Sequence, residues 1–139
     1  MTARDKPAEV AVPPPDSVLI AFTHVPDEAI ARAIAQALVD EKLAACVNIL
    51  APCTSIYRWE GEVECAQEWP LVIKTTRNRF AALQARLRDL HPYELPDLMA
   101  CTPTAVLPDY AAWVIRETRR SPVGTQRDSR SQRATSSEK

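Results

Sequence analysis

The chain has 139 residues, of which 46% are hydrophobic, and a formal net charge of −1, which suits one globular domain. No apolar run approaches the roughly 18–20 residues that a membrane-spanning helix needs, and no segment has the pattern of a signal peptide. We therefore expect a cytoplasmic protein without a membrane partner.

The two ends of the sequence differ from its middle. Residues 1–16 are polar and rich in proline, and residues 119–139 hold mostly Ser, Thr, Gln and Arg. Neither segment can bury enough surface to offset its ordering entropy, so we predict two disordered tails around one domain at 17–118. The second tail is basic, but it lacks aromatic residues for base stacking. A solvated terminus is therefore favoured over a nucleic-acid-binding tail.

The first part of the domain indicates a β-α-β unit. Residues 18–23 form an apolar run of strand length. Pro26, Asp27 and Glu28 give a helix start, with Pro at the first helical position. Apolar residues then recur at helical spacing to about Lys42. A second strand is predicted at 45–50.

A β-hairpin is predicted next, at 55–64. Its side chains alternate in character, and Gly61 can adopt the positive φ that a tight turn requires. A separate strand is predicted at 69–76, where another apolar run occurs.

The remaining elements repeat the β-α-β order. Asn78 is a candidate N-cap for a helix with apolar residues at helical spacing, and Pro92 ends that helix. A strand follows at 98–101, and Pro108 opens a short last helix. The order predicts an α+β fold of the ferredoxin-like, split β-α-β type, with an added hairpin and a C-terminal helix.

Five motifs occur along this order, namely Ala44-Ala45-Cys46-Val47-Asn48-Ile49, Ser55-Ile56-Tyr57-x-Trp59-x-Gly61, Ile73-Lys74-Thr75, His91-Pro92-Tyr93-Glu94 and Tyr110-x-x-Trp113. In this order and spacing they resemble the signature of the CutA divalent-cation tolerance family. The resemblance implies a ferredoxin-like protomer, a tight homotrimer and a role in tolerance of divalent metals, notably copper.

The hairpin gives a physical reason for association. An isolated hairpin is marginal in water and leaves an unpaired strand edge. Pairing of sheets between subunits would satisfy that edge and bury Tyr57 and Trp59. We therefore expect these two residues at the trimer interface.

His91 is the candidate metal ligand, because imidazole commonly binds copper and the residue lies in a family motif. The alternative is that His91 caps the carbonyl end of the preceding helix. Some family members proposed to bind copper have a Cys where this sequence has Phe22, and a second His where it has Leu90. His24 could replace a lost donor.

A second constellation consists of Lys74, Tyr93, Glu94 and Trp113. An unpaired ammonium buried in a strand is costly, so Lys74 should point outward or meet a partner such as Glu94. The set is either a structural ion pair at a subunit seam or a cleft for a small anionic ligand.

The function classes that remain open differ in chemistry. The first is a trimer without evident catalysis that binds a divalent metal such as copper, or a small effector in the manner of PII-type regulators. The second is a thiol or hydrolytic enzyme at an intersubunit cleft. No carboxylate pair, triad or complete metal cage is visible, which disfavours an enzyme. Cys46 is expected in the core, and Cys65 is expected at the surface.

The predicted association has a direct test. At micromolar concentration we expect no populated folded monomer, because a domain of this size gains little net stability from its own core. Light scattering that finds a stable species of monomer mass would contradict this expectation.

Overall fold

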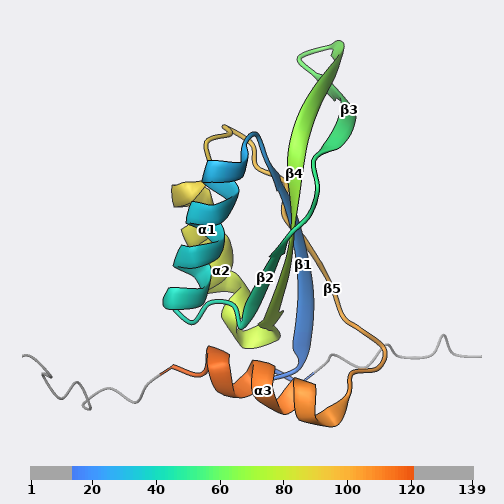
Figure 1. Ribbon diagram of the computed structural model, residues 1–139. Coiled ribbons are helices and arrows are strands. Elements are labelled where there is room, and N and C mark those ends of the chain that lie inside the picture. The colour runs from blue at the N-terminus through green and yellow to red at the C-terminus, as the bar shows by residue number, and fades with distance from the viewer. Residues whose placement is uncertain (1–13, 121–139) are drawn as a thin grey trace, which may run out of the picture.

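The computed structural model describes residues 14–120, so most of both predicted tails lies outside the described residues (Figure 1). In chain order the elements are β1 (Val18–Val25), α1 (Glu28–Asp40), β2 (Cys46–Ile49), β3 (Cys53–Trp59), β4 (Glu62–Thr76), the 3-10 turn η1 (Arg77–Arg79), α2 (Phe80–Leu90), β5 (Met99–Cys101) and α3 (Pro108–Thr118). Within this range no helix combines the length and apolar composition needed to cross a membrane.

One antiparallel sheet organises these elements. Its strand order is β2-β4-β1-β5, and β3 pairs with the first half of β4. Helices α1 and α2 lie side by side on one face of the sheet, and the β3–β4 hairpin projects beyond it (Figure 1). The predicted α+β class is confirmed.

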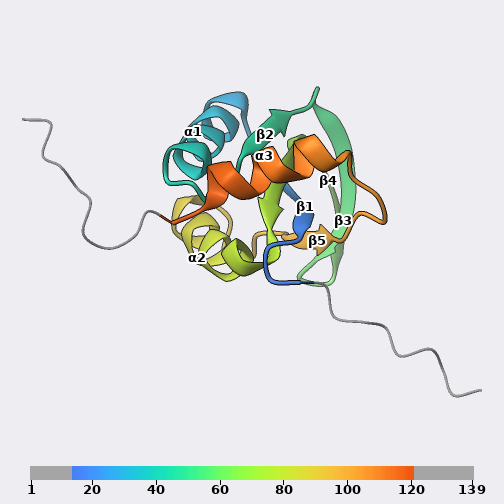
Figure 2. The ribbon, with the colours of Figure 1, turned by 90° about the horizontal axis from the view of Figure 1, so that it is seen from below.

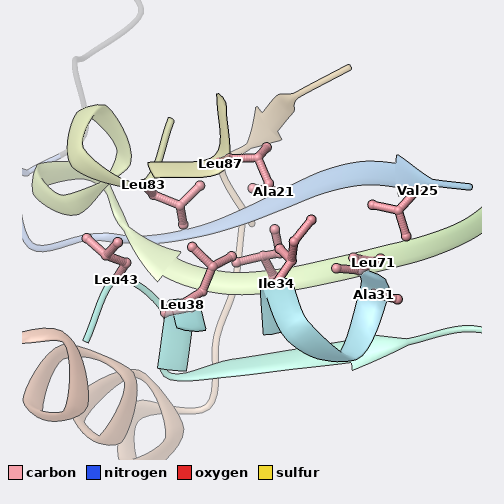
Figure 3. Close-up of a cluster of buried hydrophobic side chains, with 11 residues drawn as sticks. Ala21, Val25, Ala31, Ile34, Leu38, Leu43, Leu71, Leu83 and Leu87 are labelled. Carbon is pink, nitrogen blue, oxygen red and sulfur yellow. The ribbon is translucent and has the colours of Figure 1, made fainter. Parts of the chain in front are cut away.

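The core lies between this sheet and the two helices (Figure 3). It is built from inward-facing side chains of β1, α1, β4 and α2 and from two residues of the loop after α1, namely Ala21, Val25, Ala31, Ile34, Leu38, Leu43, Ala44, Leu71, Ile73, Leu83 and Leu87. The apolar stripes predicted for the two helices therefore do face the core. Burial of each large aliphatic side chain contributes about 1.5–3 kcal/mol, which keeps this face of the sheet closed.

The helix starts differ from the sequence prediction. Asp27, rather than Pro26, begins α1 as its N-cap, because its carboxylate accepts a hydrogen bond from the Ile30 N–H at 2.8 Å. Asn78 does not cap α2 through its side chain. Its Oδ1 instead accepts from the Thr76 hydroxyl at 2.6 Å, and the η1 turn precedes the helix.

The largest departure concerns the predicted hairpin and the strand after it. The sequence pattern predicts two separate elements, but Glu62–Thr76 is one continuous strand of 15 residues. Its first half pairs with β3, and its second half lies between β1 and β2. Pro70 does not interrupt it. This residue has no N–H to donate, but it lies just outside the stretch of β4 that pairs with β2, and its carbonyl accepts a hydrogen bond from the Leu50 N–H at 2.9 Å.

The remaining segments close the lower end of the sheet. Helix α3 runs across this end (Figure 2). Its Val114 packs with Val18 and Ala45. Residues 14–16, predicted as part of the first tail, form a turn beside η1, and the Pro15 carbonyl accepts from the Asn78 N–H at 2.7 Å.

The hairpin turn consists of Glu60 and Gly61, and both have positive φ, 47° and 81°. A two-residue turn of this kind favours Asn-Gly, because Asn tolerates the left-handed region better than Glu.

We therefore expect Glu60→Asn to raise the free energy of unfolding by about 0.5–1 kcal/mol and Gly61→Ala to lower it by about 1 kcal/mol. Denaturant unfolding at one fixed chain concentration measures both. Glu60→Gln removes the same charge without relieving the backbone, so a gain equal to that of Glu60→Asn would contradict the explanation.

Candidate functional site

The segment after α2, residues 91–97, is attached to the sheet by hydrogen bonds from its side chains. The first comes from His91, which is 6% exposed. Its Nδ1 accepts from the Tyr93 N–H at 3.2 Å, so the ring proton lies on Nε2, which donates to the His24 carbonyl at 2.8 Å. Both ring nitrogens are therefore in use.

The second attachment joins the segment to β4. The Tyr93 hydroxyl donates to Oε2 of Glu68 at 2.8 Å, and Glu68 is 8% exposed. Burial and the neighbouring carboxylate raise the pKa of Tyr93 well above its ordinary value of 10. The phenol thus stays protonated and supplies a donor to a carboxylate that has left bulk water.

The third attachment joins the segment to the end of β1. Asp97 accepts from the His24 backbone N–H at 3.0 Å and from its Nδ1 at 2.7 Å, and the Asp97 carbonyl accepts from the Thr23 hydroxyl at 2.7 Å. Because Nδ1 is bound to the carboxylate, Nε2 is the nitrogen of His24 left for another ligand.

Between this segment and the β3–β4 hairpin lies a groove of about 650 Å³, a size that suits a small ligand. We call it the hairpin groove. It is lined by His24, Ser55, Tyr57, Arg58, Trp59, Glu64, Glu68, Pro92, Tyr93, Glu94, Leu95 and Asp97. Aromatic and acidic side chains predominate in this lining.

The structure separates the predicted cleft residues. Tyr93 and Glu94 line the hairpin groove, whereas Lys74 and Trp113 do not. The Lys74 ammonium contacts Oδ1 of Asn48 rather than Glu94. Trp113 packs against the cluster at the lower end of the sheet and stacks with Tyr110 at a ring distance of 5.7 Å. The four residues therefore do not form one site within a single chain.

The structure also places the other residues that the sequence analysis singled out. Tyr57 and Trp59 lie on β3 and contribute to the groove wall. Phe22 is half-buried on β1, and Leu90 packs against the core, so neither offers a donor. Local sequence patterns do not point to Glu68 or Asp97, because their partners Tyr93 and His24 are distant in the chain. Glu64 lies opposite Tyr57 in the predicted hairpin, and no motif marks it as a groove residue.

The described residues contain no group of three or more His, Cys, Asp or Glu side chains arranged to hold a metal ion. Cys46 is half-buried, with its thiol near Oδ1 of Asn48 at 3.8 Å, and Cys65 is exposed as predicted. Since both nitrogens of His91 are already bonded, His91 and Cys46 do not form a base and nucleophile in this chain.

Comparison with known proteins relates this geometry to a family. A family model for the CutA1 divalent ion tolerance protein matches residues 19–117. The chain belongs to the CutA1 family. The CutA protein of Thermus thermophilus, named for divalent-cation tolerance, is 48% identical over 99 residues, which are 71% of this chain and 96% of that one. Mouse protein CutA is 41% identical over 100 residues, and the match spans 56% of its length.

Solved structures of CutA1 family members have the same fold. Xylella fastidiosa CutA aligns with a TM-score of 0.72 at 41% identity, covering 74% of this chain and 99% of that one. The Thermus thermophilus protein aligns with a TM-score of 0.72 at 44% identity, covering 73% and 99%. The bacterial relatives are named for tolerance of divalent cations rather than for a reaction.

The bond between Tyr93 and Glu68 predicts a specific pH dependence. Near neutral pH, Tyr93→Phe should lower the free energy of unfolding by about 1–2 kcal/mol, because it removes a donor from a buried carboxylate. The folded-state pKa of Tyr93 lies above its unfolded value of 10. The advantage of wild type over Tyr93→Phe should therefore be full below pH 10 and decline above it.

Denaturant unfolding of both proteins across this range measures the effect. Tyr110→Phe is the matched control near neutral pH, because the Tyr110 hydroxyl makes no hydrogen bond within residues 14–120 and its loss should cost little. A wild-type advantage that stays constant above pH 10 would contradict the assignment.

Proposed function

We propose that this chain serves divalent-cation tolerance as a binding protein without catalysis, and that its ligand site is the hairpin groove. The observation that carries the proposal is the fixed wall of this groove. His91, Tyr93 and Asp97 hold the 91–97 segment against the sheet. A wall held in this way is already formed before a ligand arrives, which lowers the entropy cost of binding. The family name supports the tolerance role.

We further infer a homotrimer of ferredoxin-like protomers. The strand order β2-β4-β1-β5 interleaves the two β-α-β units, as a ferredoxin-like protomer requires. On the hairpin, Ile56 and Val63 are 73% and 63% exposed, and β3 has a free edge within the described chain. Pairing of this edge between subunits would cover the two exposed apolar side chains and satisfy the unpaired backbone groups of β3. Tyr57 and Trp59 would then lie at a subunit seam, with the groove opening beside it.

The alternative function is copper binding through His91. Copper at this residue would have to displace the hydrogen bond to the His24 carbonyl or the one from the Tyr93 N–H. The described part of the chain also lacks the further donors that a retained transition metal needs. A small effector in the groove, as in PII-type regulators, agrees better with this arrangement.

Copper titration separates the two roles. We expect wild type to bind Cu²⁺ no more tightly than a single exposed imidazole, with His24→Ala removing most of this binding. His91→Gln should leave the affinity unchanged but lower the melting temperature, because it disturbs two structural hydrogen bonds. If wild type binds one Cu²⁺ per chain tightly and His91→Gln abolishes this binding, copper binding is the function and the effector proposal is wrong.

A further inference from the structure

The hairpin groove has three aromatic side chains, Tyr57, Trp59 and Tyr93. Two of them come from alternate positions on β3 and thus from one face of that strand, and the third comes from the 91–97 segment opposite. Aromatic rings carry a negative face, and a cation within about 6 Å of such a ring is attracted to it.

The charges around these rings are mainly negative. The groove has four carboxylates, Glu64, Glu68, Glu94 and Asp97, against Arg58 and His24. Both basic groups already have partners, because Arg58 donates to the Gly61 carbonyl at 3.4 Å and His24 is bound to Asp97. Glu94 is exposed and has no hydrogen bond or ion pair within residues 14–120.

The pKa values of the two phenols, Tyr57 and Tyr93, are raised in this groove. Burial raises the pKa of Tyr57, and the carboxylates of Glu64 and Glu68 raise it further. The pKa of Tyr93 is raised by burial and by its bond to Glu68. The negative carboxylates that help to raise these two pKa values also favour a positively charged ligand beside the rings.

The kind of cation follows from the geometry. A bound metal ion needs several donors at 2.0–2.6 Å, and these carboxylates do not form such a group. An organic ammonium ion needs no convergent donors. Its charge is spread over a larger volume and is satisfied by ring faces and by carboxylates a few ångströms away.

We propose that the hairpin groove binds the ammonium group of a small organic cation, with Tyr57, Trp59 and Tyr93 contacting it and Glu64 and Glu94 supplying the opposite charge. This inference rests on the groove being the ligand site proposed above. It replaces the small anion expected from the sequence, because Lys74, the cation of that constellation, lies outside the groove.

Calorimetric titration of the full chain with choline and with 3,3-dimethyl-1-butanol tests the inference, because the two molecules share a shape and differ in the ammonium charge. We expect choline to bind at least about tenfold more tightly, which corresponds to a cation–π contribution of ordinary size. Equal affinity for both molecules would overturn the inference.

Variants locate the binding. Glu94→Gln should weaken choline binding about threefold, as the loss of one exposed charge does, and should leave 3,3-dimethyl-1-butanol unaffected. Asp89→Asn is the matched control, because it makes the same change in charge at an exposed position of α2 outside the groove. Trp59→Leu keeps apolar bulk but removes the ring, and should weaken choline binding about fivefold or more. Equal effects of Glu94→Gln and Asp89→Asn would overturn the assignment to the groove.

A third probe separates this inference from the proposed function. If pyrophosphate binds and choline does not, and Glu94→Gln changes the pyrophosphate affinity, the groove is a ligand site but not for cations, and the inference alone fails. If neither choline nor pyrophosphate binds, the groove is not a ligand site, and both the proposed function and this inference fail. A basic side chain of a neighbouring subunit that fills the groove would give this result.

Discussion

The candidate site depends on one constraint, the attachment of the 91–97 segment to the sheet. Pro92 ends α2, and without further contacts the chain beyond it would be an exposed loop. The His91 ring prevents this, because it accepts a hydrogen bond from its own segment and donates one to the backbone carbonyl of His24, near the end of β1. Tyr93 and Asp97 add attachments to β4 and β1. The same residue that the family motif offers as a metal ligand is thus a structural support of the groove.

The opposite wall of the groove depends on the continuity of β4. Because one strand of 15 residues pairs with β3 in its first half and with β1 and β2 in its second, the hairpin is a rigid extension of the core sheet (Figure 1). Glu68 lies near the boundary between these halves, where it receives the Tyr93 hydroxyl. Aromatic and acidic groups are thereby held across a fixed gap, and the excess of carboxylates gives the gap a negative character.

Sequence patterns predicted those features that depend on neighbours in the chain. The stripes of α1 and α2, the turn at Gly61 and the end of α2 at Pro92 all follow from local spacing. Local patterns do not predict the continuity of β4, because residues 65–68 form no apolar run between the predicted hairpin and the predicted strand. The pairing of these residues with β3 becomes visible only in the register. Tyr93 and Glu94 were found through a motif. Their surroundings were not, because Glu68 and Tyr93 are 25 residues apart in sequence and His24 and Asp97 are 73 apart.

His91 is a structural residue, because both of its ring nitrogens are bonded to backbone partners. Nitrogen-15 chemical shifts of its imidazole test this most directly. We expect the ring proton on Nε2, and shifts that stay unchanged when one equivalent of Zn²⁺ is added. A proton on Nδ1, or a change of either nitrogen shift on addition of Zn²⁺, would contradict it.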